Sequence, residues 1–253
     1  MSIRIIPRLD IKGTNVIKGI QMDGLRIIGE PSEMADRYYV QSADEIAFFD
    51  VVASLYGRQN LTNLIRQVAE ASFIPLTVTG GIRSPGDARL AIANGADKVG
   101  VNTAAIGNPD VLQSIANIFG SQAVVLSIEA RRTDSSNWEA FTDSGREPSG
   151  LNAISWAKEA KSMGAGEINI TSVDQDGTLK GPDLDLIYQI RECTDLPLVY
   201  GGGISTLDDV AKCANLGVDG IQIGLALHRK KFTIKECKLH LQKSGHKVRV
   251  LST

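Results

Sequence analysis

Two carboxylate side chains stand at the ends of apolar segments, where they could perform acid–base chemistry. Asp10 follows the apolar run at residues 3–9, and Glu129 follows the run at residues 123–128. A carboxylate that stays ionised can abstract a proton, and a second one whose pKa is raised by its surroundings can donate one. The first histidine of the chain is His228, so proton transfer would fall to carboxylates or lysine. Either acid could instead cap a helix or anchor a loop.

Two pairs of glycines could bind phosphate groups. Gly80-Gly81 and Gly202-Gly203 each end an apolar run shortly before a predicted helix. Backbone N–H groups and the helix dipole at such a turn can hold an anion. The next run in each half ends in Asn102-Thr103 or in Gly224. The pattern favours a substrate with two phosphates, although a glycine pair is also an ordinary strand-to-helix turn.

A third polar loop contains Asp174, Asp176 and Gly177 and follows the apolar run at residues 167–171. Its carboxylates could bind substrate hydroxyls, or the segment could simply form a turn.

Eight short apolar runs alternate with segments of helical periodicity, which is typical of βα units around a parallel sheet. The predicted strands are residues 3–9, 45–50, 75–79, 98–102, 123–128, 167–171, 197–201 and 220–224. Helix starts are predicted at Ser84-Pro85 and at Thr206. Two connections are longer than the others: one spans residues 11–30, and the other contains a small hairpin predicted at residues 138–143.

An internal repeat favours a closed barrel. Residues 74–103 align without a gap on residues 196–225, and the two glycine pairs fall on each other. Two (βα)4 halves, about 1–120 and 121–253, would close into one (β/α)8 TIM barrel domain spanning residues 1–253. An open doubly wound sheet is less favoured, because such sheets do not usually repeat after four units.

Four charged residues stand at or near strand starts, at the end of the predicted barrel opposite the two acids. They are Arg4, Glu45, Lys98 and Glu167. Two positive and two negative side chains could form a closed ring across the barrel axis. Such a ring could act as a gate, or its members could simply be solvated or paired.

The amino-acid composition limits the classes of binding partner and cofactor that the chain is expected to have. The formal charge of -2 arises from 27 basic and 29 acidic residues, which predicts neither a nucleic acid nor an anionic membrane as partner. Three cysteines without close pairing indicate reduced thiols in a cytoplasmic protein. We expect no export signal and no membrane span, since no 18 apolar residues run together. We also expect no metal and no cofactor, because histidines and cysteines lack suitable spacing.

The chain resembles the cyclase subunit of imidazole glycerol phosphate synthase over nearly its whole length. The matching motifs are Arg4-Ile5-Ile6-Pro7, Leu9-Asp10, Lys18-Gly19, Gly80-Gly81-Ile82-Arg83-Ser84, Gly95-Ala96-Asp97-Lys98-Val99, Asn102-Thr103-Ala104, Gly164-Ala165-Gly166-Glu167 and Asp176-Gly177-Thr178.

The resemblance implies a specific reaction. A bis-phosphorylated ribulosyl substrate and ammonia would give imidazole glycerol phosphate and AICAR in histidine biosynthesis. A separate glutaminase subunit docked at the N-terminal face would supply the ammonia, which would pass the charged ring and cross the barrel interior. Asp10 and Glu129 would form the acid–base pair, and Lys18 would lie on a mobile loop that closes over the substrate.

Several residues depart from the family's pattern. Glu129 stands where the family has an aspartate, Arg8 replaces a small residue, Val52 stands where a hydroxyl is usual, and Leu225 replaces a serine. These changes, with the segment 53–58, resemble a paralogous branch that partners a glutaminase in amidation of surface-polysaccharide sugars. That ammonia-channelling role is the alternative function. A barrel binding a simpler sugar phosphate, such as an isomerase or epimerase, is a third interpretation.

Overall fold

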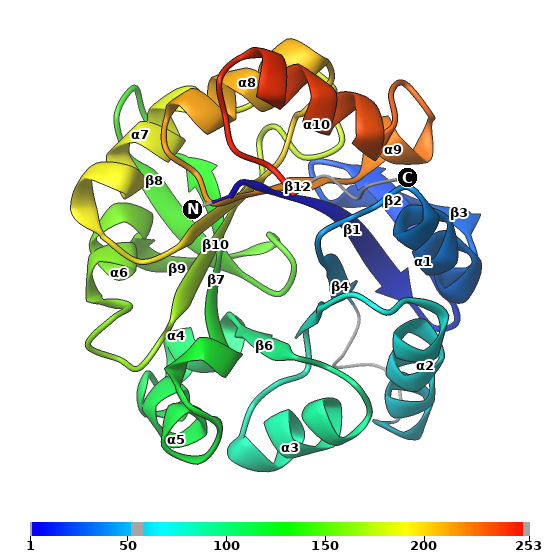
Figure 1. The fold of residues 1–253 in the computed structure, drawn as a ribbon. Coiled ribbons are helices and arrows are strands. Elements are labelled where there is room, and N and C mark those ends of the chain that lie inside the picture. The colour runs from blue at the N-terminus through cyan, green and yellow to red at the C-terminus, as the bar shows by residue number, and fades with distance from the viewer. Residues whose placement is uncertain (1, 52–57, 250–253) are drawn as a thin grey trace.

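The barrel strands lie side by side in a closed ring. In the computed structural model, which describes residues 2–51 and 58–249, eight parallel strands form this ring and the helices surround it (Figure 1). In ring order they are β1 (Arg4–Lys12), β4 (Ile46–Asp50), β5 (Leu76–Thr79), β6 (Lys98–Val101), β7 (Val124–Arg132), β10 (Glu167–Ser172), β11 (Leu198–Gly201) and β12 (Gly220–Ile223). The (β/α)8 TIM barrel predicted from the sequence is confirmed.

Two strand pairings complete the ring. Strand β12 pairs in parallel with β1, with Gly220 opposite Arg4, and β7 pairs with β10, with Glu129 opposite Thr171. Because successive side chains of a strand point to opposite faces, every second residue points into the barrel. The polar residues Arg4 and Arg8 therefore alternate with outward-facing apolar residues along β1.

The helices cover the outside of the ring. They are α1 (Pro31–Val40), α2 (Arg58–Ala71), α3 (Pro85–Ala93), α4 (Thr103–Gly107), α5 (Asp110–Phe119), α6 (Ala153–Glu159), α7 (Leu184–Cys193), α8 (Leu207–Asn215), α9 (Leu225–His228) and α10 (Ile234–Lys243), with a 3-10 turn at Ser121–Ala123. The main hydrophobic core lies between helices and strands, where outward-facing residues such as Ile5, Ile168 and Ile221 are fully buried. None of the described helices is long and apolar enough to cross a membrane.

Both predicted helix starts are confirmed. The side chain of Ser84 accepts a hydrogen bond from the Asp87 N–H at the start of α3, with Pro85 in the first turn. Thr206 and Asp209 form a reciprocal capping box at the start of α8. Such caps satisfy N–H groups that the first helical turn leaves unpaired.

Two antiparallel hairpins extend the barrel at its C-terminal end. The long connection after β1 contains β2 (Asn15–Ile20) and β3 (Asp23–Gly29), and the one after β7 contains β8 (Trp138–Thr142) and β9 (Glu147–Asn152). The small hairpin predicted within residues 138–143 is wrong. That segment is a single strand, because Trp138 to Phe141 pair with β7 and the turn comes after Thr142.

A second, small apolar cluster lies inside the barrel. It contains Ile6, Ala47, Phe49 and Val199, with Val51 packed against it. These are inward-facing positions of β1, β4 and β11, so part of the interior is filled by apolar side chains.

Candidate active site

The two acids chosen from the sequence lie at the same end of the barrel. Asp10 is near the end of β1 and Glu129 is on β7, and both side chains are buried. Both strands are parallel and continue into the hairpins, so these carboxylates face the barrel mouth at the C-terminal ends of the strands. This is the end at which barrel enzymes place their catalytic groups.

Cations surround Asp10. The Arg8 Nε donates to its Oδ1 at 2.7 Å, and the Lys18 Nζ donates to its Oδ2 at 2.6 Å. Burial opposes ionisation, but the charges of Arg8 and Lys18 outweigh it and hold the pKa of the Asp10 carboxyl well below its ordinary value. Asp10 is therefore a carboxylate at every physiological pH.

Glu129 has the opposite protonation behaviour. It accepts hydrogen bonds from the Asn102 Nδ2 at 3.0 Å and the Gly145 N–H at 2.8 Å. Burial raises its pKa to about 7, although Arg8 and the Gly145 N–H act in the other direction. One carboxylate thus stays ionised while the other can carry a proton near neutral pH, which suits an acid–base pair.

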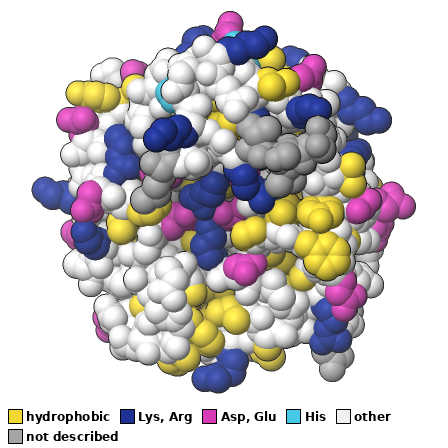
Figure 2. All heavy atoms as spheres, viewed as in Figure 1, with side chains coloured by type: hydrophobic (Ala, Val, Ile, Leu, Met, Phe, Trp, Pro, Cys, Tyr) yellow, Lys and Arg dark blue, Asp and Glu magenta, His cyan; other side chains and the backbone are white. Residues whose placement is uncertain are grey.

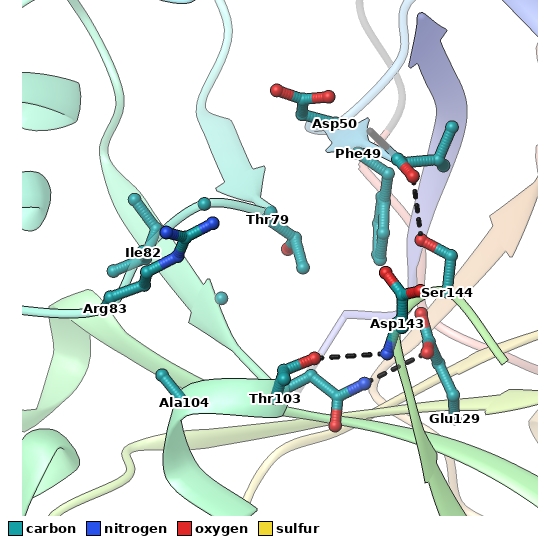
Figure 3. Close-up of a pocket in the computed structure, with 15 residues that line it drawn as sticks. Phe49, Asp50, Thr79, Ile82, Arg83, Thr103, Ala104, Glu129, Asp143 and Ser144 are labelled. Atoms are coloured by element: carbon teal, nitrogen blue, oxygen red, sulfur yellow. Dashed lines mark hydrogen bonds between the residues drawn. The ribbon is translucent and has the colours of Figure 1, made fainter. Parts of the chain in front are cut away.

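The first glycine pair borders an open cavity of about 270 Å³ next to Glu129. Gly80, Gly81, Asn102 and Thr103, all predicted from the sequence to bind phosphate, line it. Figure 3 shows Arg83 on one side of this cavity and Glu129 on the other. The turn of the β8–β9 hairpin forms part of the wall, because the Asp143 N–H donates to Thr103 Oγ1 at 3.2 Å.

The backbone at the two glycine turns requires glycine. Gly80 and Gly202 have φ values of 101° and 117°, which other residues rarely adopt. A Cβ at Gly80 would also collide with the Asp50 carbonyl oxygen. Both turns therefore place backbone at the barrel mouth, where its N–H groups could bind an anion.

The second glycine pair borders a much smaller space. The cavity lined by Gly202, Gly203 and Gly224 holds about 20 Å³, and Arg8 and Lys18 also line it. The Arg8 Nη1 donates to Thr171 Oγ1 at 2.8 Å, and its guanidinium stacks on the Phe49 ring at 3.8 Å. The first predicted phosphate site thus borders an open cavity, whereas the second borders a small space lined by the cationic side chains of Arg8 and Lys18.

Lys18 ties the β2–β3 hairpin to the mouth. It lies on strand β2, and its Nζ donates to both Asp176 oxygens, at 2.9 and 2.7 Å, as well as to Asp10. Gly177 follows in the same loop, where a Cβ would collide with the Gly19 carbonyl oxygen of the hairpin. The structure therefore brings Asp10, Lys18, Asp176 and Gly177 together.

The four charged residues at the other end of the barrel form a closed ring. Arg4 donates to Glu45 and Glu167 at 2.6 Å each, and Lys98 lies 2.9 Å from Glu45 and 2.8 Å from Glu167. Each cation contacts both anions, so the ring is internally neutral. It lies across the barrel axis, as the sequence suggested, and its gating role stays a prediction.

Some residues at the mouth were not chosen as site residues from the sequence. Arg8 was noted only as a departure, yet it contacts Asp10 directly. Arg83 and Ser144 line the open cavity. His228 packs against Tyr38, whose hydroxyl lies 2.6 Å from its Nδ1, and burial lowers its pKa to about 4. The position of Arg83 directly after the glycine turn was the available signal.

The remaining departures have different outcomes. Leu225 begins helix α9 and lines the smaller cavity. Val52 and residues 53–57 lie outside the described residues, and Arg58 begins α2. Within residues 2–51 and 58–249, no group of three or more His, Cys, Asp or Glu side chains is arranged to hold a metal ion.

Comparison with known proteins gives consistent matches. A family model described as "Histidine biosynthesis protein" matches residues 4–233. The imidazole glycerol phosphate synthase subunit HisF of Legionella pneumophila is 51% identical over 208 residues, which cover 82% of this chain and 98% of the relative. HisF of Exiguobacterium sibiricum is 42% identical, covering 97% of this chain and 98% of the relative. HisF of Streptomyces griseus is also 42% identical, covering 98% and 99%.

Proposed function

The chain belongs to the histidine biosynthesis protein family, in which it is a cyclase subunit of the imidazole glycerol phosphate synthase type, and from that premise we propose how its residues act. Ammonia and a bis-phosphorylated ribulosyl substrate give imidazole glycerol phosphate and AICAR at the C-terminal mouth of the barrel. Asp10 accepts protons, and Glu129 donates them.

The observation that carries this assignment is the opposite protonation of two carboxylates at one barrel mouth, of which Glu129 lines the cavity bordered by Gly80 and Gly81. Ammonia that attacks a carbonyl carbon must lose protons, and the oxygen and nitrogen that leave must gain them. Asp10 is ionised and Glu129 holds a proton up to a pH of about 7. Glu129 lines the same cavity as Gly80 and Gly81, so a phosphate bound there would hold the reacting part of the substrate near it.

We assign Lys18 a gating role at this mouth. A carboxylate whose pKa lies far below its ordinary value is a weak base, and Lys18 contributes to that depression. The smaller cavity also needs space for the second phosphate. A phosphate at Gly202 and Gly203 would draw the Lys18 ammonium away from Asp10, which would open the cavity and make Asp10 more basic.

Steady-state turnover of the synthetic bis-phosphate with excess ammonium salt at about pH 7, where Glu129 is still partly protonated, tests this assignment. The expected result is product formation that Asp10→Asn lowers at least about a hundredfold, as removal of a general base does. Turnover no higher than that of the Asp10→Asn control would remove it.

A glutaminase subunit at the N-terminal face is the partner that we propose. The relatives are named as subunits, which implies a partner chain. Figure 2 shows charged side chains of both signs at the centre of one face, with hydrophobic side chains beside them. Val40 at the end of α1 and Phe73 before β5 precede barrel strands, and both are strongly exposed. An apolar patch beside the charged ring suits docking of the protein that releases ammonia there.

A cytoplasmic location accompanies this proposal. Cys193, Cys213 and Cys237 are free thiols, and burial raises the pKa of each, so they stay unreactive in a reducing compartment.

The altered mouth favours one second candidate. In it, the barrel passes ammonia from the glutaminase to a separate protein that amidates a sugar. The specific observation is the second phosphate site, where Arg8 and Lys18 line a cavity of only about 20 Å³. The charged ring would serve both functions equally, so it does not separate them.

A reconstituted system separates the two candidates. The chain is combined with its glutaminase and a candidate amidotransferase, and the aminated sugar formed from glutamine is measured. Ammonia transfer predicts a loss of product when the ring is altered by Lys98→Ala. Unchanged glutamine-dependent product would remove support for the second candidate.

A further inference from the structure

The barrel wall between the charged ring and Asp10 carries a column of polar side chains. On β10, Glu167 belongs to the ring and Thr171 bonds to Arg8, so both point inward. Asn169 lies between them and therefore also points inward, with successive inward residues about 6.6 Å apart. On β12, Gln222 points inward as well, and its neighbours in register are Ile6 and Gly201.

Two oxygens in this column lack partners. Among the described residues, neither Asn169 Oδ1 nor Gln222 Oε1 has a hydrogen-bond partner, although the two side chains are only 3% and 5% exposed. The Asn169 amide is held in place, because its Nδ2 lies 3.3 Å from Ser127 Oγ. Leaving a buried carbonyl oxygen without a donor is costly, so such groups normally bind a small molecule such as water.

A glycine leaves space beside the second oxygen. The point where a Cβ on Gly201 would stand lies 3.3 Å from Gln222 Oε1 and 3.7 Å from Thr171 Oγ1. Strand register places Gly201 between Thr171 and Gln222. Two oxygen atoms from the strands on either side of β11 therefore face one small space within the wall.

We infer that Asn169 and Gln222 are successive binding positions for ammonia on its way from the ring to Asp10. This inference rests on the proposed function, which requires ammonia to cross the barrel. Neutral ammonia has three N–H donors, which match unpaired carbonyl oxygens. The ammonium ion does not fit this route, because Arg4 and Lys98 stand at its start and Arg8 at its end.

Water can also donate hydrogen bonds to these oxygens through its two O–H groups, so the test must separate ammonia transit from simple hydration. The proposal predicts that the two amides matter more when ammonia comes from glutamine than when ammonium salt is added from solution. If the oxygens merely hold buried water, their loss affects both supplies alike.

The experiment uses the barrel in complex with its glutaminase. Asn169→Leu and Gln222→Met keep the side-chain size and remove the carbonyl oxygen, and Ile170→Val is the matched control on the outer face of β10. Product formation is measured with glutamine and, separately, with ammonium salt. Free ammonia released from amide-labelled glutamine is measured alongside.

The expected result is a fall of about three- to tenfold in the ratio of glutamine-driven to ammonium-driven rate, as for loss of one hydrogen bond. Free ammonia should rise in step, and Ile170→Val should keep the wild-type ratio. A wild-type ratio in both Asn169→Leu and Gln222→Met would overturn the inference and leave hydration only. Failure of the proposed function appears separately, as no product from wild type with ammonium salt, and would overturn both.

Discussion

At the scale of single residues, the charged groups around each carboxylate set its pKa and therefore its role in proton transfer. Asp10 and Glu129 are equally buried at the same mouth, yet their pKa values move in opposite directions. Two cations touch Asp10, whereas an amide and a backbone N–H touch Glu129. The Arg8 charge and the Gly145 N–H offset the effect of burial only partly, so Glu129 keeps a raised pKa.

Glu129→Gln should abolish one limb of the pH profile. If Glu129 donates a proton, the wild-type rate falls as pH rises through about 7, because the acid is then lost. The variant should turn over at least about a hundredfold more slowly and lack that limb. Rates from pH 5.5 to 9 with ammonia held constant provide the measurement. A limb that persists in the variant would contradict the assignment.

The same substitution should stabilise the fold in alkaline solution. The folded pKa of Glu129 is above its ordinary value of 4.5, so the glutamate's contribution is fully present below pH 4.5 and is lost as pH rises through about 7. Glutamine does not titrate. The melting temperature of Glu129→Gln relative to wild type should therefore rise between pH 5 and 8, and a constant difference would count against the raised pKa.

Residue types at strand ends were enough to select Asp10, Glu129 and the glycine turns. The role of Arg8 was harder to predict, because a sequence does not say whether a long side chain reaches solvent or folds inward. Its direction became clear only from its contacts with Asp10, Thr171 and Phe49.

At the scale of elements, Lys18 helps to anchor the β2–β3 hairpin over the mouth, together with hydrogen bonds from Gln21 to the loop after β10. Lys18 bonds to Asp10 on β1 and to Asp176 after β10, so the hairpin position depends on two carboxylates. Apart from this anchor, the hairpin carries exposed apolar residues, including Ile20 and Ile27.

Asp176→Asn should loosen this hairpin. Asparagine keeps one acceptor and removes the charge, so opening of residues 15–29 should become easier by about 1 to 3 kcal/mol. Hydrogen exchange of the β2 and β3 amides measures the change, with the amides of β5 as internal control. Equal protection in variant and wild type would mean that other contacts hold the hairpin.

Strand positions were predicted well, and connections were not. The eight barrel strands are short apolar runs, which buried parallel strands require, and their bounds agree within a few residues. The outer strands β3 and β9 of the two hairpins are mostly exposed, so no run of buried apolar residues marks them in the sequence. The origin of the two halves by duplication stays a prediction.

At the scale of the whole molecule, the two ends of the barrel are chemically distinct. The mouth contains the carboxylates and the glycine turns. The opposite end contains the neutral ring of Arg4, Glu45, Lys98 and Glu167. The exposed residues Val40 and Phe73 shortly precede strands β4 and β5 in the sequence. This difference suits the proposal that ammonia is supplied at the ring and reacts at the mouth.

Phe73→Asp should weaken binding of the glutaminase. Phe73 is 82% exposed and contacts the Tyr39 ring, so an aspartate there would place a charge in an apolar contact. Loss of an aromatic anchor costs about 2 kcal/mol or more, which raises Kd about thirtyfold. Calorimetric titration measures it, with Tyr188→Asp on the outer helix α7 as control. Equal affinity for both variants would place the partner elsewhere.

The pairing of β12 with β1 also governs how the molecule can form. These two strands come from opposite ends of the sequence, so the barrel closes only when the strands between them are also in place. Until the barrel closes, the sheet has two edge strands with unpaired N–H and C=O groups, which can pair with other copies of the chain. Folding of this protein should therefore be slow and should depend on protein concentration. Because the closed barrel has no edge strands, its unfolding should also be slow.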